Sequence, residues 1–219
     1  MPEIIYIDLG IIPPNMNVHS YLVEVDDGYI IFDAGYDLNV MEKALLEKEI
    51  SPLDIQYVLL THSDYDHVAS LPLFANAQIF MSEDEMQMVN GTTKRTVEGI
   101  GLSLNLLPDD VNLDEISLLH NGQLLEFGEH IIECIKVPGH TPGSMAYVLD
   151  DKYLFTGDAF AVENDTMAIH PYTSDIKAAV NSITKLRDLK NESELVLTAH
   201  YRSYSPKDLK YDAMIKLQK

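Results

Sequence analysis

Short apolar runs separated by turn residues predict an α/β protein. In the first half, the pattern predicts a strand at 3–8, a hairpin at 21–32 around Asp26-Asp27-Gly28, a helix at 37–49 capped by Asp37, and a strand at 55–60. In the second half the same order returns as a hairpin at 146–155, a helix from 174 or 175 to about 189, and a strand at 195–197. The strands that close the two halves run into L-L-T-H and V-L-T-A-H. We therefore predict two similar halves, packed face to face, with both sets of strand ends at one edge.

The stretch between the two halves is less regular. Ser82-Glu83-Asp84-Glu85 has the form of a capping box and predicts a short helix to about Val89. The glycine-containing segment 90–112 is expected to be a mobile loop or lid. Asn121-Gly122 predicts a further hairpin before a strand at 131–137. A last helix is expected to start at Ser205-Pro206 and to run to the C-terminus.

Composition narrows the class of protein. The 219 residues, 46% of them apolar, are expected to form one domain over 1–219. The net charge of -20, from 15 basic and 35 acidic residues, disfavours a nucleic-acid partner. The N-terminus does not resemble a signal peptide, and no apolar run approaches the roughly 20 residues that span a membrane. Cys134 stands alone, which fits a reducing compartment. We expect a cytoplasmic protein with a small-molecule substrate and no membrane partner, and we leave a homodimer open.

Metal-binding side chains stand just after several of the apolar runs. They are His62, Asp64, Asp66 and His67 in H-S-D-Y-D-H, His140 in P-G-H-T-P-G-S, Asp158 in T-G-D, and His200 in L-T-A-H. Because ligands converge at strand ends in layered α/β folds, we expect these side chains to meet. Together they supply about as many ligands as two divalent ions need, with positions left for water and substrate.

The spacing within the first cluster lets one run serve two ions. Alternate residues of an extended chain share a face, so His62 and Asp64 point the same way. Asp66 and His67 are expected where the chain turns into a helix that begins near Val68. Further along the chain, Asp158 can place one carboxylate oxygen on each ion.

Other polar residues receive supporting roles. Asp33, which ends a predicted strand in D-A-G, is expected to hydrogen-bond the ligand loops and histidines from the second shell of the centre. His170 lies outside the ligand runs and is expected to be structural or exposed; it is also a candidate, with Tyr201 and Tyr204, to line the substrate pocket. No other substrate-binding residue is assigned.

Taken together, D-A-G, H-x-x-x-D-H, G-H-T-P-G-S, G-D and a late A-H resemble the metallo-β-lactamase-fold superfamily over residues 3–204. The resemblance implies a four-layer αβ/βα sandwich of two mixed sheets flanked by helices, with a dinuclear metal site at one edge. By position, it implies that His62, Asp64 and His140 bind the first ion and that Asp66, His67 and His200 bind the second. Asp158 would bridge the two ions together with a hydroxide.

One position departs from the superfamily pattern. Hydrolytic members usually carry a histidine where this chain has Asp64. With the extra carboxylate, the ligands and hydroxide cancel the charge of two divalent ions, which predicts a weaker Lewis acid, or iron or manganese instead of zinc. The flavodiiron branch has a glutamate there, but also a flavodoxin domain for which this chain has no room. A further alternative is that Asp64 weakens the first position and leaves a single ion at the second.

The main functional hypothesis is a metal-dependent hydrolase of a small ester, thioester or lactone, in which Asp66 orients the hydroxide and carries a proton. G-H-T-P-G-S is similar to glyoxalase II-like thioester hydrolases. Only 19 residues follow His200, however, so their helical substrate domain is not expected and a glutathione thioester is not favoured. A phosphodiesterase, a non-haem di-iron redox protein and a metal-binding module without turnover remain as alternatives.

Overall fold

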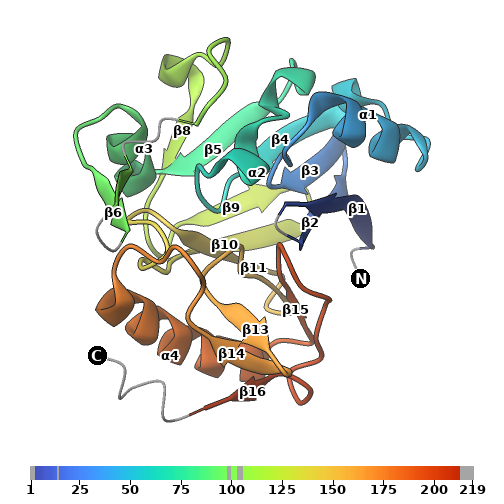
Figure 1. Ribbon diagram of the computed structural model, residues 1–219. Coiled ribbons are helices and arrows are strands. Elements are labelled where there is room, and N and C mark those ends of the chain that lie inside the picture. Colours follow the sequence, from blue (N-terminus) through green and yellow to red (C-terminus); the bar gives the residue numbers. More distant parts are fainter. Residues whose placement is uncertain (1–2, 14, 98–99, 103–105, 213–219) are drawn as a thin grey trace.

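Two β-sheets face each other at the centre of the protein (Figure 1). The computed structural model describes residues 3–13, 15–97, 100–102 and 106–212. The first sheet has the order β1 (Ile4–Ile12), β2 (Met16–Val25), β3 (Gly28–Phe32), β4 (Ile55–Leu59), β5 (Gln78–Ser82) and β8 (Ser117–Leu119). The second has the order β15 (Leu195–Leu197), β12 (Tyr153–Phe155), β11 (Met145–Leu149), β10 (His130–Lys136) and β9 (Leu124–Phe127).

Helices cover the outer faces of the two sheets (Figure 1). On the first sheet they are α1 (Leu38–Leu46), α2 (Tyr65–Val68) and α3 (Glu83–Val89); α4 (Ile176–Glu192) lies on the second. Single 3-10 turns occur at Pro52–Asp54, Leu71–Leu73 and Leu113–Glu115. Over the part of the chain that the structure describes, no helix is both long and apolar enough to cross a membrane.

Three apolar layers hold these elements together, which makes the fold a four-layer sandwich. Under α1, the buried Met41 and Leu45 pack against the first sheet. Under α4, Val180 and Ile183 pack against the second sheet, since residues three or four apart lie on one face of a helix. Aromatic and aliphatic side chains fill the space between the sheets. The predicted fold class is therefore confirmed.

The two halves follow the same plan, as the sequence predicted. Strand β2 pairs antiparallel with β3, and β3 pairs parallel with β4 after the crossover through α1. Likewise β11 pairs antiparallel with β12, and β12 pairs parallel with β15 after the crossover through α4. Each crossover helix begins at an aspartate, because Asp37 accepts from the N–H groups of 39 and 40 and Asp175 from that of 178.

Within the described residues, the predicted C-terminal helix was wrong, and the predicted loop at 90–112 contains two short strands. Residues 205–209 form turns, and Lys210–Tyr211 forms the short strand β16 instead of a helix. It pairs parallel with β14 (Thr166–Ala168), which pairs with β13 (Ala161–Glu163); residues 213–219 of the predicted helix lie outside the described residues. In the segment predicted as a loop, β6 (Arg95–Val97) and β7 (Ile100–Leu102) form a hairpin.

One turn and the start of one helix also differ from their predictions. Asn121-Gly122 connects β8 of the first sheet to β9 of the second, and the hairpin between β9 and β10 turns at Gly128 instead. Helix α2 begins at Tyr65, not near Val68, so Asp66 and His67 lie inside it. The short helix presents both side chains to the edge of the sheets where the strand ends meet.

Candidate metal centre

The seven side chains that the sequence singled out lie together at one edge of the sandwich. They come from the segments that follow the ends of β4, β10, β12 and β15, and the segment after β4 includes helix α2, which carries Asp66 and His67. Within the described residues, four overlapping triplets have ligand atoms within 4.8 Å of one another: His62, Asp64 and His140; Asp66, His67 and His200; His62, His67 and Asp158; His140, Asp158 and His170. The last triplet includes a histidine that the sequence did not place in the centre.

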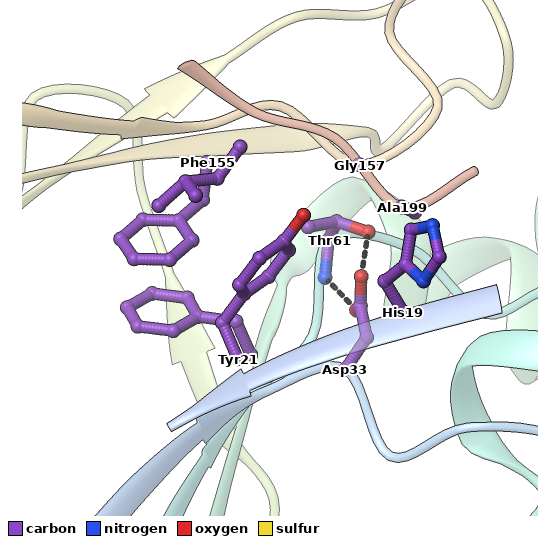
Figure 2. A pocket seen from close by; sticks show the side chains of 9 residues that line it. His19, Tyr21, Asp33, Thr61, Phe155, Gly157 and Ala199 are labelled. Atoms are coloured by element: carbon purple, nitrogen blue, oxygen red, sulfur yellow. Dashed lines mark hydrogen bonds between the residues drawn. The ribbon is translucent and has the colours of Figure 1, made fainter. Parts of the chain in front are cut away.

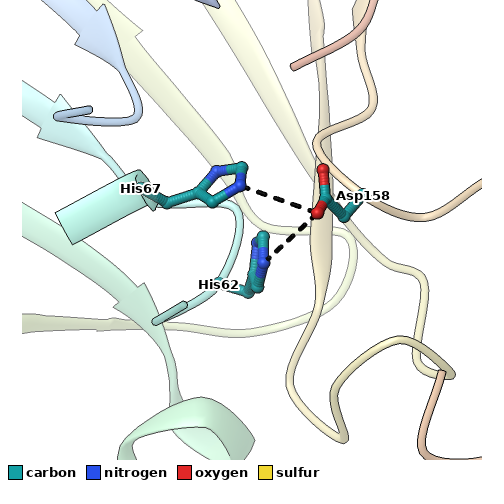
Figure 3. A group of neighbouring side chains, drawn as sticks. All are labelled: His62, His67 and Asp158. Carbon is teal, nitrogen blue, oxygen red and sulfur yellow. Dashed lines mark ion pairs between the residues drawn. The ribbon is translucent and has the colours of Figure 1, made fainter. Parts of the chain in front are cut away.

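The carboxylate of Asp158 lies at the middle of the group. Figure 3 shows two of its neighbours, with Asp158 Oδ2 at 3.8 Å from His62 Nε2 and 3.7 Å from His67 Nε2. The same oxygen lies 3.6 Å from His140 Nε2, 3.5 Å from His170 Nε2 and 3.1 Å from His200 Nε2. Five imidazoles therefore surround one buried carboxylate.

Several of these buried polar atoms have no hydrogen-bond partner among the described residues. They are His62 Nε2, His67 Nε2, Asp66 Oδ2 and Asp158 Oδ1. Unpaired buried polar atoms are costly in a native fold unless an ion or water satisfies them. Imidazole nitrogens and carboxylate oxygens are also ligands that Zn²⁺ binds. These residues thus fit a divalent metal ion.

The opposite nitrogens of the same rings are held by the protein. His67 Nδ1 lies 2.9 Å from Asp33 Oδ2, and His200 Nδ1 lies 2.7 Å from the carbonyl oxygen of Asn17. A hydrogen bond that fixes Nδ1–H leaves the lone pair on Nε2, the arrangement found in carboxylate–histidine–metal groups. Both rings are therefore oriented with Nε2 toward Asp158.

Asp33 binds the first ligand loop from below (Figure 2). Its two oxygens accept hydrogen bonds from the backbone N–H and the hydroxyl of Thr61, both at 2.8 Å. Asp33 has a φ of 60°, a left-handed conformation that aspartate tolerates better than most residues. Its oxygens contact the loops and His67, as the sequence predicted, while a role in metal binding stays a prediction.

A small cavity lies beneath Asp33 and Thr61. It is lined by Tyr21, Phe32 and Phe155 and by residues of the ligand loops, and its volume is about 10 Å³ (Figure 2). This is room for about one water molecule, too little for a substrate. Gly157 lies at its wall with a φ of 48°, and a Cβ there would lie 2.4 Å from Thr61 Oγ1. The glycine before Asp158 therefore allows the two loops to approach.

The pKa values of the histidines in the centre depend on two opposing effects, burial and the charges of nearby aspartates. Burial opposes the protonation of His67, but Asp33, Asp66 and Asp158 raise its pKa well above the usual value. Burial lowers the pKa of His140 to about 3, despite the hydrogen bond with Asp64. In the metal-free protein, the three aspartates therefore favour the charged form of His67, whereas burial favours the neutral form of His140.

Asp64 has a partner that the sequence did not reveal. The guanidinium of Arg95, at the start of β6, contacts Asp64 Oδ1 through Nη1, and the arginine side chain is 3% exposed. Arg95 Nη2 donates to the carbonyl oxygen of Tyr172 at 3.0 Å and lies 3.3 Å from His140 Nε2. Asp64 Oδ2 faces the imidazoles instead, at 3.0 Å from His140 Nε2 and 3.5 Å from His62 Nε2. Asp64 and Arg95 thus form an ion pair beside the centre.

Glu85 was also missed as a supporting residue. Its fully buried carboxylate accepts from the N–H and hydroxyl of Ser63, both at 2.7 Å, and from the hydroxyl of Thr141 at 2.7 Å. Ser82 caps α3 by accepting from the Glu85 N–H, but the Glu85 side chain does not return to Ser82 as a capping box requires. The carboxylate instead joins the loops that carry His62 and His140.

The comparisons with known proteins agree with this architecture. A model of the metallo-beta-lactamase superfamily matches residues 13–200, and the chain belongs to that superfamily. The crystal structure of ST1585, an archaeal metallo-beta-lactamase superfamily protein from Sulfolobus tokodaii, aligns with a TM-score of 0.66 at 18% identity, over 95% of this chain and 84% of that one. At this identity the likeness shows the fold alone.

Two curated relatives share more of the sequence. The "Probable metallo-hydrolase MJ0296" of Methanocaldococcus jannaschii is 30% identical over 164 residues, which cover 74% of this chain and 64% of that protein. The "Probable polyketide biosynthesis zinc-dependent hydrolase PksB" of Bacillus subtilis is 27% identical over 150 residues, 66% of this chain and 56% of that protein. The match therefore spans less than two thirds of each relative's length.

Proposed function

We propose that this protein is a metal-dependent hydrolase whose centre binds two divalent ions, with zinc as the expected metal and iron or manganese as alternatives. The observation that carries the proposal is the group of buried, unpartnered ligand atoms that face one another around Asp158. The relatives described as a metallo-hydrolase and a zinc-dependent hydrolase support it. When bound, such ions supply a hydroxide at neutral pH and polarise the bond to be broken.

The pairing of Asp64 with Arg95 supports hydrolysis over redox chemistry. The guanidinium cancels the charge of the carboxylate, so the pair has the same net charge as the neutral histidine of hydrolytic members. A harder metal such as iron would be favoured by an uncompensated carboxylate at this position, and Arg95 compensates the charge of Asp64. The di-iron redox alternative is therefore the less favoured one.

Asp66 is the residue best placed to handle the proton. Its Oδ2 is buried without a hydrogen-bond partner and lies 3.3 Å from His200 Nε2 and 3.7 Å from His67 Nε2. A carboxylate in this position can orient the attacking water and then take up its proton. Asp66 would thereby act as a ligand and as the general base.

For the substrate, we propose a small ester, thioester or lactone. The net charge of -20 disfavours polyanions, because like charges repel an approaching substrate. A phosphodiester is the alternative that a substrate panel must include. The panel is a thioester, a lactone, an activated ester and a phosphodiester, each tested with zinc, manganese and iron forms of the protein.

The test compares two aspartates that each contact a histidine. Asp158→Asn removes a charge inside the centre, whereas Asp150→Asn removes one beside His130, where Nδ1 lies 2.8 Å from Asp150 Oδ2. We expect Asp158→Asn to lose metal, measured by elemental analysis after dialysis, and to lose hydrolysis, while Asp150→Asn keeps both. A parent protein that binds none of the three metals, or an Asp158→Asn variant with full metal content, would overturn the proposal.

A further inference from the structure

We infer that His170 is a metal ligand, and that with His140 and Asp158 it forms the first ion's site in place of Asp64. The inference rests on the proposed metal centre and names which of this chain's residues complete it. The three ligand atoms lie within 4.8 Å of one another, and all three side chains are buried.

The spacing around His170 suits a coordinated ion. Its Nε2 lies 3.5 Å from Asp158 Oδ2, and His140 Nε2 lies 3.6 Å from the same oxygen. Ligand atoms that surround a tetrahedral ion at about 2.1 Å are separated by about 3.4 Å. The rings of His140 and His170 have centroids 4.6 Å apart and stand nearly perpendicular, at 84°. Each ring can therefore point a nitrogen at the same place without stacking on the other.

The hydrogen bond at the far side of the ring determines which nitrogen faces the centre. His170 Nδ1 lies 2.7 Å from the carbonyl oxygen of Pro171, which can only accept, so Nδ1 carries the hydrogen. In a neutral ring the lone pair is then on Nε2, directed at another acceptor, the Asp158 carboxylate. A cation bound between His170 Nε2 and the Asp158 carboxylate would satisfy both acceptors.

The loop of His170 is fastened to the loop of His140. The Thr173 hydroxyl donates to the His170 carbonyl at 2.6 Å, and the Ser174 hydroxyl donates to the carbonyl oxygens of Gly139 and His140, both at 2.9 Å. The backbone N–H of Ser174 also donates to the Gly139 carbonyl at 2.9 Å. Two ligands on loops joined in this way are held at a fixed separation, as a preorganised metal site requires.

Arg95 explains why Asp64 gives up this position. Arg95 binds Oδ1 of Asp64 and offsets the charge of the carboxylate, which weakens Asp64 as a metal ligand even though its Oδ2 faces the imidazoles. Arg95 also binds the carbonyl of Tyr172, two residues beyond His170. The same side chain therefore engages Asp64 and supports the loop that brings the substitute ligand.

The experiment measures metal binding, not turnover. The parent, His170→Ala and Asp64→Asn are loaded with Zn²⁺ and with Co²⁺, and the ions per chain and the visible Co²⁺ spectrum are recorded. The matched control is His130→Ala, which removes a buried histidine that bonds Asp150 outside the centre. We expect His170→Ala to bind one of the ions at least tenfold more weakly and to change the Co²⁺ spectrum, while Asp64→Asn and the control bind as the parent does.

Two further variants keep the result decisive if a single substitution prevents folding. His170→Gln retains a polar side chain in the loop, and Asp64→Ser is a second neutral replacement that leaves Arg95 and its bond to Tyr172 in place. A His170 variant with the metal content and Co²⁺ spectrum of the parent would overturn the inference, as would loss of that same ion from the Asp64 variants. In either case a parent that still binds metal leaves the proposed hydrolase intact, whereas a parent that binds none refutes both.

Discussion

Asp33 and His67 are joined by a 2.9 Å hydrogen bond between Oδ2 and Nδ1, although they stand 34 residues apart in the chain. The bond turns the other ring nitrogen of His67 toward the Asp158 carboxylate. Because the same aspartate also holds the backbone and hydroxyl of Thr61, it fixes the ligand loop and the ligand ring together.

Asp33→Asn is expected to weaken metal binding about 10- to 100-fold. The amide can still accept from the Thr61 N–H, but its NH₂ group cannot accept the hydrogen from His67 Nδ1, so the ring loses its orientation. Competition with a chromophoric chelator measures the affinity. Asp27→Asn, at an exposed aspartate that bonds Tyr57, serves as the control and should bind metal as the parent does. Equal affinities for the two variants would contradict the orienting role of Asp33.

Glu85→Ala is expected to destabilise the protein by about 3 kcal/mol, because it leaves the hydrogen-bonding groups of Ser63 and Thr141 buried without a partner. Urea unfolding, followed by circular dichroism on the metal-free protein, gives the free energy of unfolding. Glu42→Ala, on the exposed face of α1, should change that free energy by less than about 0.5 kcal/mol. A loss as small as this at Glu85 would show that the two ligand loops hold together without it.

Metal uptake near neutral pH is expected to release protons. The pKa of His67 is raised in the folded, metal-free protein, since three aspartates outweigh the effect of burial, so its charge stabilises that state below the unfolded value of 6.5. That contribution is lost as the pH rises through the folded pKa. An ion must displace this proton, and metal affinity should therefore fall as the pH falls. Calorimetry in buffers of different ionisation enthalpy counts the protons, and Asp33→Asn should release fewer; a count of zero in the parent at pH 7 would be inconsistent with a charged His67.

Cys134 is expected to be unreactive in the folded protein. The side chain is fully buried in β10, and burial, followed by the charge of Glu133, raises the pKa of its thiol to about 12. A disulfide reagent at pH 8 should therefore label no thiol in the native protein and one per chain in denaturant. Rapid labelling of the native protein would mean that the strand between β9 and β11 opens readily.

Local signals explain which parts of the fold could be predicted. Asp37 and Asp175 cap their helices by contacts within three residues, so the sequence alone places α1 and α4 well. The prediction of a C-terminal helix failed over the described residues because Lys210–Tyr211 pairs with β14. Pairing with this distant strand outweighs the local helix-start signal at Ser205-Pro206. In the segment after α3, β6 pairs with the neighbouring β7, and these three-residue strands are too short for a pattern of alternating apolar residues to reveal them.

The candidate centre shows the same limit. The seven candidate ligands, among them His62, lie in motifs at strand ends, and the order of the strands brings these ends together. Arg95 lies in a segment with no motif, 31 residues from Asp64, so nothing in the sequence predicts that the two side chains meet. His170 lies outside the ligand runs, in a loop whose position depends on hydrogen bonds to the loop of His140.

The stacked rings of Phe32 and Phe155, with centroids 3.7 Å apart, form a floor under the ligand loops. Molecules larger than water cannot pass on that side, because the cavity between the two rings and the ligand loops has room for about one water molecule. A substrate of the proposed hydrolase would therefore have to approach the ligand loops from a side other than this floor.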